Sequence, residues 1–378
     1  MFRKYDLKDY NFRLLLWLTA LSVTGVLFVG SAMRSLMMKQ FLGVILGISL
    51  MLIVSMMDYS WVLGFQWMIY FFNLALLALV YVVGRDVNGA TRWIEIAGFR
   101  FQPVELSKIL LVLFFAKYFM DHENDLSRFS TIVRSLLLIA LPLILVYRQP
   151  DLKNTITLLF LFAVMYFAAG ISYKVVALVL LVTIPLLVGG LTMVIRGDLD
   201  ILTEYQRGRI MMFLDPDNEE YSDRTAQQRN SVIAIGSGQL TGKGWNNSSV
   251  GSVNKGNFIP ETETDFIFAV IGEELGFLGS VGVIILLLLV VFECLLISRK
   301  AKDLAGRVLC SGMACIISVQ SFFNIGVACG MLPNTGTPLP FISYGLTSLV
   351  SLFIGMGFVL NVGMQGRIRL AGGGRRER

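Results

Sequence analysis

Two sets of charged residues interrupt an otherwise apolar chain and could do chemistry. In the first, Glu105 and Lys108 lie three residues apart, just after Pro103, a residue suited to the first turn of a helix. Residues at i and i+3 share a helix face. They therefore either form a mutually neutralising ion pair or leave Lys108 as a cation lining an outward-facing cavity. The sequence leaves both alternatives open.

The second set is centred on Asp265, a candidate proton acceptor. Residues 264–275 are predicted to form a short helix, with Asp265 in its first turn. Thr262 and Asp265 have the spacing of a capping box, in which the carboxylate only satisfies a backbone donor. The two roles are compatible, because a helix N-terminus favours the ionised carboxylate while apolar neighbours such as Phe266 favour the protonated form.

A third group consists of arginines in segments predicted to face outward. They are Arg85, Arg92, Arg100, Arg148, Arg207 and Arg209. Arginine binds phosphate well through its fixed fork of donors, so the group could hold an anionic partner. Anchoring to lipid headgroups is the alternative.

The elements that must position these residues are membrane-spanning helices. Of the 378 residues, 55% are hydrophobic and 15% charged, against roughly 25% charged in a soluble domain, which excludes a water-soluble enzyme. Ten apolar runs are long enough to be spans, so the fold class is all-α and polytopic. The runs are 14–32, 41–57, 61–83, 104–120, 135–147, 155–171, 175–195, 277–297, 308–332 and 341–364.

The distribution of Lys and Arg predicts the orientation. An even number of spans places both termini on one side, and the basic residues concentrate there, including the arginines between Arg367 and Arg378. Both termini should therefore be cytoplasmic. The net charge of +6 then suits the anionic inner leaflet, and a nucleic-acid partner has no support.

The chain is predicted to be one membrane domain, residues 1–378, with a cytoplasmic basic tail at 365–378. A long extracytoplasmic loop is expected at about 196–263, and the uncharged stretch 330–344 could be a re-entrant loop. The single histidine, His122, makes a Ser-His-Asp triad improbable. The four cysteines show no zinc or disulfide spacing.

Several motifs, in order along nearly the whole chain, resemble the SEDS (shape, elongation, division and sporulation) family. They are Gly89-Ala90-x-Arg92-Trp93-Ile94, Phe101-Gln102-Pro103-x-Glu105-x-x-Lys108, Gln149-Pro150-Asp151-Leu152, Phe258-Ile259-Pro260-Glu261-x-x-Thr264-Asp265-Phe266, Gly272-Glu273-Glu274-Leu275-Gly276 and Gly336-x-x-Leu339-Pro340-Phe341-Ile342-Ser343-Tyr344-Gly345. Phe258 to Glu261 favours the RodA branch over the FtsW branch. The chain departs from the family at Lys153-Asn154-Thr155, where Gly-Thr is usual, and at 251–257, which lacks an expected Gln.

The resemblance implies a bacterial inner-membrane glycosyltransferase that polymerises lipid II into β-1,4 glycan strands for cell elongation. Its implied partners are a class B penicillin-binding protein and other membrane proteins of the elongation complex. Asp265 would be the catalytic carboxylate and Glu105 and Lys108 a functionally important buried pair. Arg92, Arg148, Arg209 and Glu261 would support substrate or diphosphate binding.

Inverting transfer from an α-linked diphosphate needs one base, here Asp265. The leaving polyprenyl diphosphate needs positive charge, from Lys108, the arginines or a divalent cation such as Mg or Mn. Three alternatives stay open: a lipid II flippase, the FtsW-like division branch of the family, and a non-catalytic scaffold. The outer-boundary placement of Asp265, Arg92 and Arg148 favours the enzyme, since transport needs access from both faces.

Overall fold

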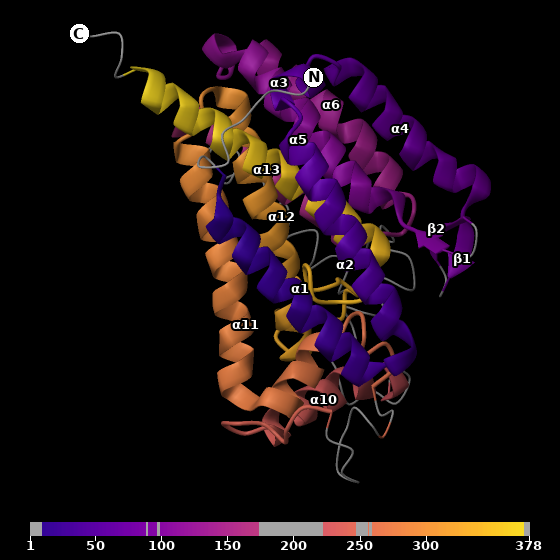
Figure 1. Ribbon diagram of the computed structural model, residues 1–378. Helices are drawn as coiled ribbons and strands as arrows, with labels where there is room; N and C mark the ends of the chain where they lie inside the picture. The colour runs from indigo at the N-terminus through magenta and orange to yellow at the C-terminus, as the bar shows by residue number, and fades with distance from the viewer. Residues whose placement is uncertain are drawn as a thin grey trace.

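The computed structural model describes residues 10–87, 90–96, 99–173, 222–246, 256 and 259–373. Eight of its helices are long and apolar enough to cross a membrane. They are α1 (Phe12–Ala32), α2 (Arg34–Ser55), α4 (Gln66–Val83), α6 (Phe129–Tyr147), α7 (Leu152–Ala169), α11 (Ile267–Arg299), α12 (Leu304–Ala328) and α13 (Leu346–Gly373). Figure 1 shows them packed as one helical bundle.

The remaining helices are α3 (Tyr59–Leu63), α5 (Pro103–Asp121), the 3-10 turn η2 (Glu123–Asp125) and α10 (Ser222–Ser237). Helix α5 is as long as a span but carries four charged residues, among them Glu105 and Lys108. Nine of the ten predicted runs fall on helices. The tenth, 175–195, lies outside the described residues, as do Arg207 and Arg209.

Among the eight candidate spans, α12 and α13 are the most buried, and they form the centre of the bundle together with the equally buried α5. Helix α2 packs along α13, and α12 packs against α5, α7 and α11. The close approach of α2 to α13 depends on two glycines one helical turn apart. A Cβ on Gly43 would overlap the side chain of Leu346, and one on Gly47 would overlap the ring of Phe353. Small residues at this spacing let helix backbones approach closely.

We expect Gly47→Ala to destabilise the bundle by about 1–3 kcal/mol, because the added methyl group overpacks the contact with Phe353. Gly282→Ala in α11 is the matched control, since a Cβ there meets nothing within 4 Å. Thermal unfolding of the purified variants in detergent measures the difference. Equal melting temperatures for the two variants would contradict the packing argument.

A small antiparallel sheet lies between α4 and α5 and was not predicted. Strand β2 (Ala90–Ile96) pairs with β1 (Arg85–Val87) and with β3 (Phe99–Phe101). Two of the strands have three residues, which is too short for an alternating pattern to stand out in the sequence. The sheet leaves the all-α fold class unchanged and fixes the backbone that carries Arg92.

The segment before α11 corrects the capping prediction. Helix α11 begins at Ile267 with Phe266 as its N-cap, so Asp265 precedes the helix rather than lying in its first turn. The capping box is therefore wrong: Phe266 makes no side-chain cap, and the amide of Asp265 donates to the carbonyl of Glu261 at 3.2 Å. A short helix ending near residue 275 is confirmed, because Gly276 breaks the helical backbone with φ 65°.

The uncharged stretch 330–344 is irregular, and its two halves differ in burial. Residues 330–336 are exposed or half-buried, whereas most residues from Thr337 to Ser343 are buried, as expected where a loop is enclosed in protein. Its boundaries differ from the prediction, since α12 ends at Ala328 and α13 starts only at Leu346. Pro338 and Pro340 lie in the stretch, and proline disfavours helix both at its own position and at the residue before it. Apolar composition alone made these residues look like parts of the spans.

The two ends of the bundle differ in character. The start of α1 and the end of α11 lie together with Gly363 of α13 at one end. At the other end α10 lies beside the start of α11 (Figure 1). Asp265 belongs to that second end, which we call the Asp265 end.

Candidate functional site

Glu105 and Lys108 form a buried ion pair in the first turns of α5. The Lys108 ammonium lies 2.8 Å from Glu105 Oε1, and the two side chains are 1% and 3% exposed. Glu105 Oε2 accepts hydrogen bonds from Ser348 Oγ at 2.8 Å and Gln320 Nε2 at 3.5 Å. The geometry favours the ion-pair alternative over a Lys108 that lines an open cavity.

The pair is connected to a second carboxylate. Lys108 Nζ lies 3.5 Å from Asn154 Oδ1, and Asn154 Nδ2 donates to Asp151 Oδ2 at 2.8 Å. Asp151 caps α7 through the amide of Asn154 and lies 3.8 Å from Arg92 Nη1 on β2. We call Glu105, Lys108, Asn154, Asp151 and Arg92 the buried charge network. It ties α5, α7 and the small sheet together.

Asp265 is held by backbone contacts on both sides of its turn. Asn324 of α12 donates from Nδ2 to the carbonyls of Asp265 at 2.9 Å and Thr337 at 2.7 Å. Ser343 Oγ donates to the carbonyl of Thr264 at 2.6 Å. These bonds fasten the Asp265 turn to the irregular stretch 330–344, while the Asp265 side chain itself stays partly exposed.

The Asp265 carboxylate lies against Gly336. A Cβ on Gly336 would lie 2.8 Å from Asp265 Oδ2 and 3.7 Å from Lys153 Nζ, and the backbone there has φ 67°. Lys153 donates a hydrogen bond to the Gly336 carbonyl. A side chain at position 336 would fill the space between the carboxylate and the ammonium, so glycine keeps it open.

A tyrosine beside the Asp265 turn is a poor alternative base. The amide of Tyr344 donates to the carbonyl of Glu263 at 2.8 Å. Burial, and then the Glu263 carboxylate, raises the pKa of the Tyr344 phenol above its ordinary value. Tyr344 is therefore protonated at neutral pH, and Asp265 is the better proton acceptor.

Comparisons with known proteins establish the family of the chain. The family model of the FtsW, RodA and SpoVE cell cycle proteins matches residues 10–368. The chain belongs to this SEDS family. Escherichia coli K12 peptidoglycan glycosyltransferase MrdB is 35% identical over 355 residues, which cover 92% of each chain. The probable peptidoglycan glycosyltransferase FtsW of Haemophilus ducreyi is 34% identical over 309 residues, covering 80% of this chain and 74% of that protein.

Solved structures share the fold. One comes from work on the structural coordination of polymerization and crosslinking by a peptidoglycan synthase complex; its TM-score is 0.79 at 30% identity, covering 94% of this chain and 98% of that one. The Thermus thermophilus rod shape determining protein RodA has a TM-score of 0.68 at 28% identity, covering 94% and 96%. This SEDS protein is therefore a multi-pass membrane protein and an enzyme of the peptidoglycan glycosyltransferase class.

The other predicted site residues of the SEDS chain are placed differently. Arg148 is exposed at the C-terminal end of α6, where Tyr81 is an electrostatic neighbour, and it does not join the buried charge network. Glu261 is exposed at φ 59°, and its carbonyl accepts the amides of Thr264 and Asp265. Arg209 lies outside the described residues.

Two acidic residues of the Gly272–Gly276 motif fasten the loop after α10 and the end of α1 to the start of α11. Glu273 Oε1 accepts from Lys243 Nζ at 2.7 Å, and Glu274 receives Ser31 Oγ and the amide of Asn246. Both carboxylates are buried. No role was predicted for them from the sequence. Charged residues are almost never fully buried without a partner, so two acidic residues in an apolar motif already indicate a fixed contact.

Metal binding stays a prediction. Within the ranges that the structure describes, no group of three or more His, Cys, Asp or Glu side chains is arranged to hold an ion. A single carboxylate with substrate phosphates is a known way to bind Mg²⁺, and the partly exposed Asp265 is our candidate for that carboxylate.

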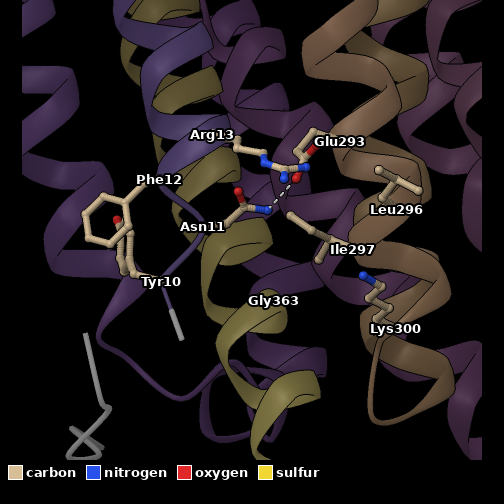
Figure 2. A pocket seen from close by; sticks show the side chains of 9 residues that line it. All are labelled: Tyr10, Asn11, Phe12, Arg13, Glu293, Leu296, Ile297, Lys300 and Gly363. Carbon is tan, nitrogen blue, oxygen red and sulfur yellow. Dashed lines mark hydrogen bonds between the residues drawn. The ribbon is translucent and has the colours of Figure 1, made fainter. Parts of the chain in front are cut away.

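A separate cavity of about 400 Å³ lies at the opposite end of the bundle, beside the ends of α11 and α13. Figure 2 shows Arg13 and Asn11 beside Glu293, with Asn11 Nδ2 donating to the Glu293 carboxylate at 2.8 Å. The cavity is separated from Asp265 by the length of α11. It therefore plays no part in the site around Asp265.

Proposed function

We propose that this peptidoglycan glycosyltransferase polymerises lipid II into β-1,4 glycan strands at the outer face of the bacterial inner membrane, with Asp265 as its general base. The observation that carries the proposal is the partly exposed Asp265 carboxylate, fastened between α12 and the irregular stretch 330–344 in a chain of the SEDS family. The positive-inside prediction assigns the Asp265 end to the outer face.

The chemistry needs one properly placed carboxylate. The acceptor's 4-hydroxyl attacks the anomeric carbon of the α-linked donor, the new β-linkage forms, and the bond to the polyprenyl diphosphate breaks. Asp265 takes the hydroxyl proton as the bond forms, and a positioned base of this kind typically contributes about 10²–10⁴-fold. The lipid tails stay in the bilayer while the sugars reach the partly exposed carboxylate.

Positive charge must meet the leaving diphosphate. Arg92 is the described candidate, since its side chain is 12% exposed and its distance of 3.8 Å from Asp151 is too long for a direct hydrogen bond. Lys108 is enclosed, so we assign it to holding α5 and α7 in place rather than to phosphate contact. Arg209 remains a proposed diphosphate ligand from the family resemblance. Arg148 remains one as an outward-facing arginine at the end of α6.

We propose a class B penicillin-binding protein as the partner that cross-links the strands. The support is the similarity to a chain of a peptidoglycan synthase complex that coordinates polymerization and crosslinking. We assign the chain to the elongation branch, together with that branch's membrane proteins, on the Phe258–Glu261 motif and the MrdB relative. The FtsW relative at 34% identity makes division the alternative role.

The experiment that tests the function separates polymerisation from lipid transport. Purified protein in liposomes receives labelled lipid II, alone and with its penicillin-binding protein carrying an inactivated transpeptidase site. We expect muramidase-sensitive glycan polymer and no transfer of lipid II between leaflets above protein-free liposomes. Transfer without polymer would favour a flippase, and neither activity from folded protein would favour a scaffold.

A further inference from the structure

Lys153 is a charged residue of the site to which the proposed reaction assigns no role. It is the second residue of α7 and follows the Gln149-Pro150-Asp151-Leu152 motif, in the place where the chain departs from its family's usual glycine. Its ammonium is only partly exposed and donates to the carbonyl of Gly336. A lysine held this way in the wall of a site needs an electrostatic reason, because burying its charge is costly.

Four charged groups act on Lys153. In order of decreasing effect they are Asp151, Asp265, Arg92 and Glu105. Geometry singles out one of them. Asp265 is the carboxylate that borders the same gap at Gly336 as the Lys153 ammonium.

The Asp265 carboxylate and the Lys153 ammonium lie on either side of Gly336. One Cβ position on Gly336 lies 2.8 Å from Asp265 Oδ2 and 3.7 Å from Lys153 Nζ, so both groups border the same point. The ammonium is held there by its hydrogen bond to the Gly336 carbonyl. This arrangement lets the positive charge act on the carboxylate through a short distance.

We propose that Lys153 is a positioning residue that keeps the Asp265 carboxylate ionised and aimed across Gly336 at the acceptor hydroxyl. This inference rests on the proposed role of Asp265 as the base. The ammonium fixes the Gly336 turn through its hydrogen bond and stabilises the negative charge of the carboxylate through space. Neither effect requires contact between Lys153 and the substrate.

Other titratable groups on the elements around Asp265 stay in place when Lys153 is changed. They are Glu261 and Glu263 on its own turn, Tyr344 in the irregular stretch, Asp151 on α7, Glu105 and Lys108 on α5, and Arg92 on β2. Asn324, the α12 contact of the turn, carries no charge. A change in pH dependence on neutralising Lys153 therefore reports its own charge.

The test is the pH dependence of glycan formation by the full-length protein with its penicillin-binding partner. Without the ammonium the carboxylate takes up a proton at higher pH, so Lys153→Met should move the rising, acid limb of the rate profile up by about one pH unit. At alkaline pH the rate should stay within a few-fold of the parent. Lys153→Arg should restore the parent's limb, since it restores the charge.

Lys153→Gln serves as a second neutral variant if the methionine variant does not fold, because its amide can still donate to the Gly336 carbonyl. Lys117→Met, at the far end of α5, is the control for loss of one positive charge. The inference is overturned if the acid limb of the pH–rate profile stays in place in both Lys153→Met and Lys153→Gln. It is also overturned if these variants lose the same fraction of the rate at every pH.

Asp265→Asn is measured in parallel and separates the two ideas. If that variant is inactive while the Lys153 variants keep the parent's limb, the base assignment stands and the role of Lys153 fails. If Asp265→Asn polymerises normally, the base assignment fails and the role of Lys153 fails with it.

Discussion

Asp265→Asn should reduce glycan formation from lipid II by at least about 10²-fold while leaving the protein folded. Asparagine keeps the size of the side chain but has no basic oxygen to accept the hydroxyl proton. The contacts that hold the turn go through backbone carbonyls, including that of Asp265 itself, and these survive the substitution. Initial rates of polymer formation, with the thermal unfolding of each protein, give the answer.

Glu263→Gln is the matched control for this substitution. It makes the same chemical change two residues away on the same turn, and the Glu263 carbonyl keeps its bond to the Tyr344 amide. We expect its rate to stay within a few-fold of the parent. A folded Asp265→Asn variant with the parent's rate would exclude Asp265 as the base, and an equally inactive Glu263→Gln would show that the turn responds to any lost charge.

The parts of the site that sequence reasoning found are those set by local spacing. Glu105 and Lys108 lie one helical turn apart, and any helix over 103–121 brings them to the same face. The spans were predictable for a related reason, because each apolar run must cross the same thickness of membrane. These inferences need no knowledge of how distant segments meet.

The parts that were missed depend on contacts between distant segments. Lys153 and Gly336 are 183 residues apart, and only the packed bundle brings them together. The capping-box prediction for Asp265 used a correct spacing but failed because Phe266 is the N-cap and Asn324 holds the turn from another helix. A tertiary contact outweighed a local pattern.

Charge at membrane depth was the informative signal for these contacts. Asp151, Glu273 and Glu274 are all buried, and each carboxylate accepts a hydrogen bond. Their place in apolar surroundings of the sequence predicts that each needs such a partner. Arg148 is exposed at the end of α6, and its proposed part in diphosphate binding stays a prediction. A boundary position says nothing about which side of a helix faces the site.

Removing the cation of the buried pair on α5 should be the most destabilising single electrostatic change among the site residues. Lys108→Met leaves the Glu105 carboxylate buried without its cation, which costs about 3–5 kcal/mol for enclosed pairs. Thermal and denaturant unfolding of the purified variant in detergent measures the loss. Lys117→Met on the same helix is the control, since its pair with Asp121 is partly exposed and should be worth about 1 kcal/mol or less.

The double variant Glu105→Gln, Lys108→Met distinguishes the cost of an orphaned charge from the value of the pair itself. A neutral glutamine at 105 can still accept from Ser348, so the double variant should be more stable than Lys108→Met alone. A double variant less stable than Lys108→Met would contradict this argument, because removing the Glu105 charge would then have brought no relief. Recovered stability without recovered polymerisation would show that the two charges on α5 are needed for activity apart from their effect on stability.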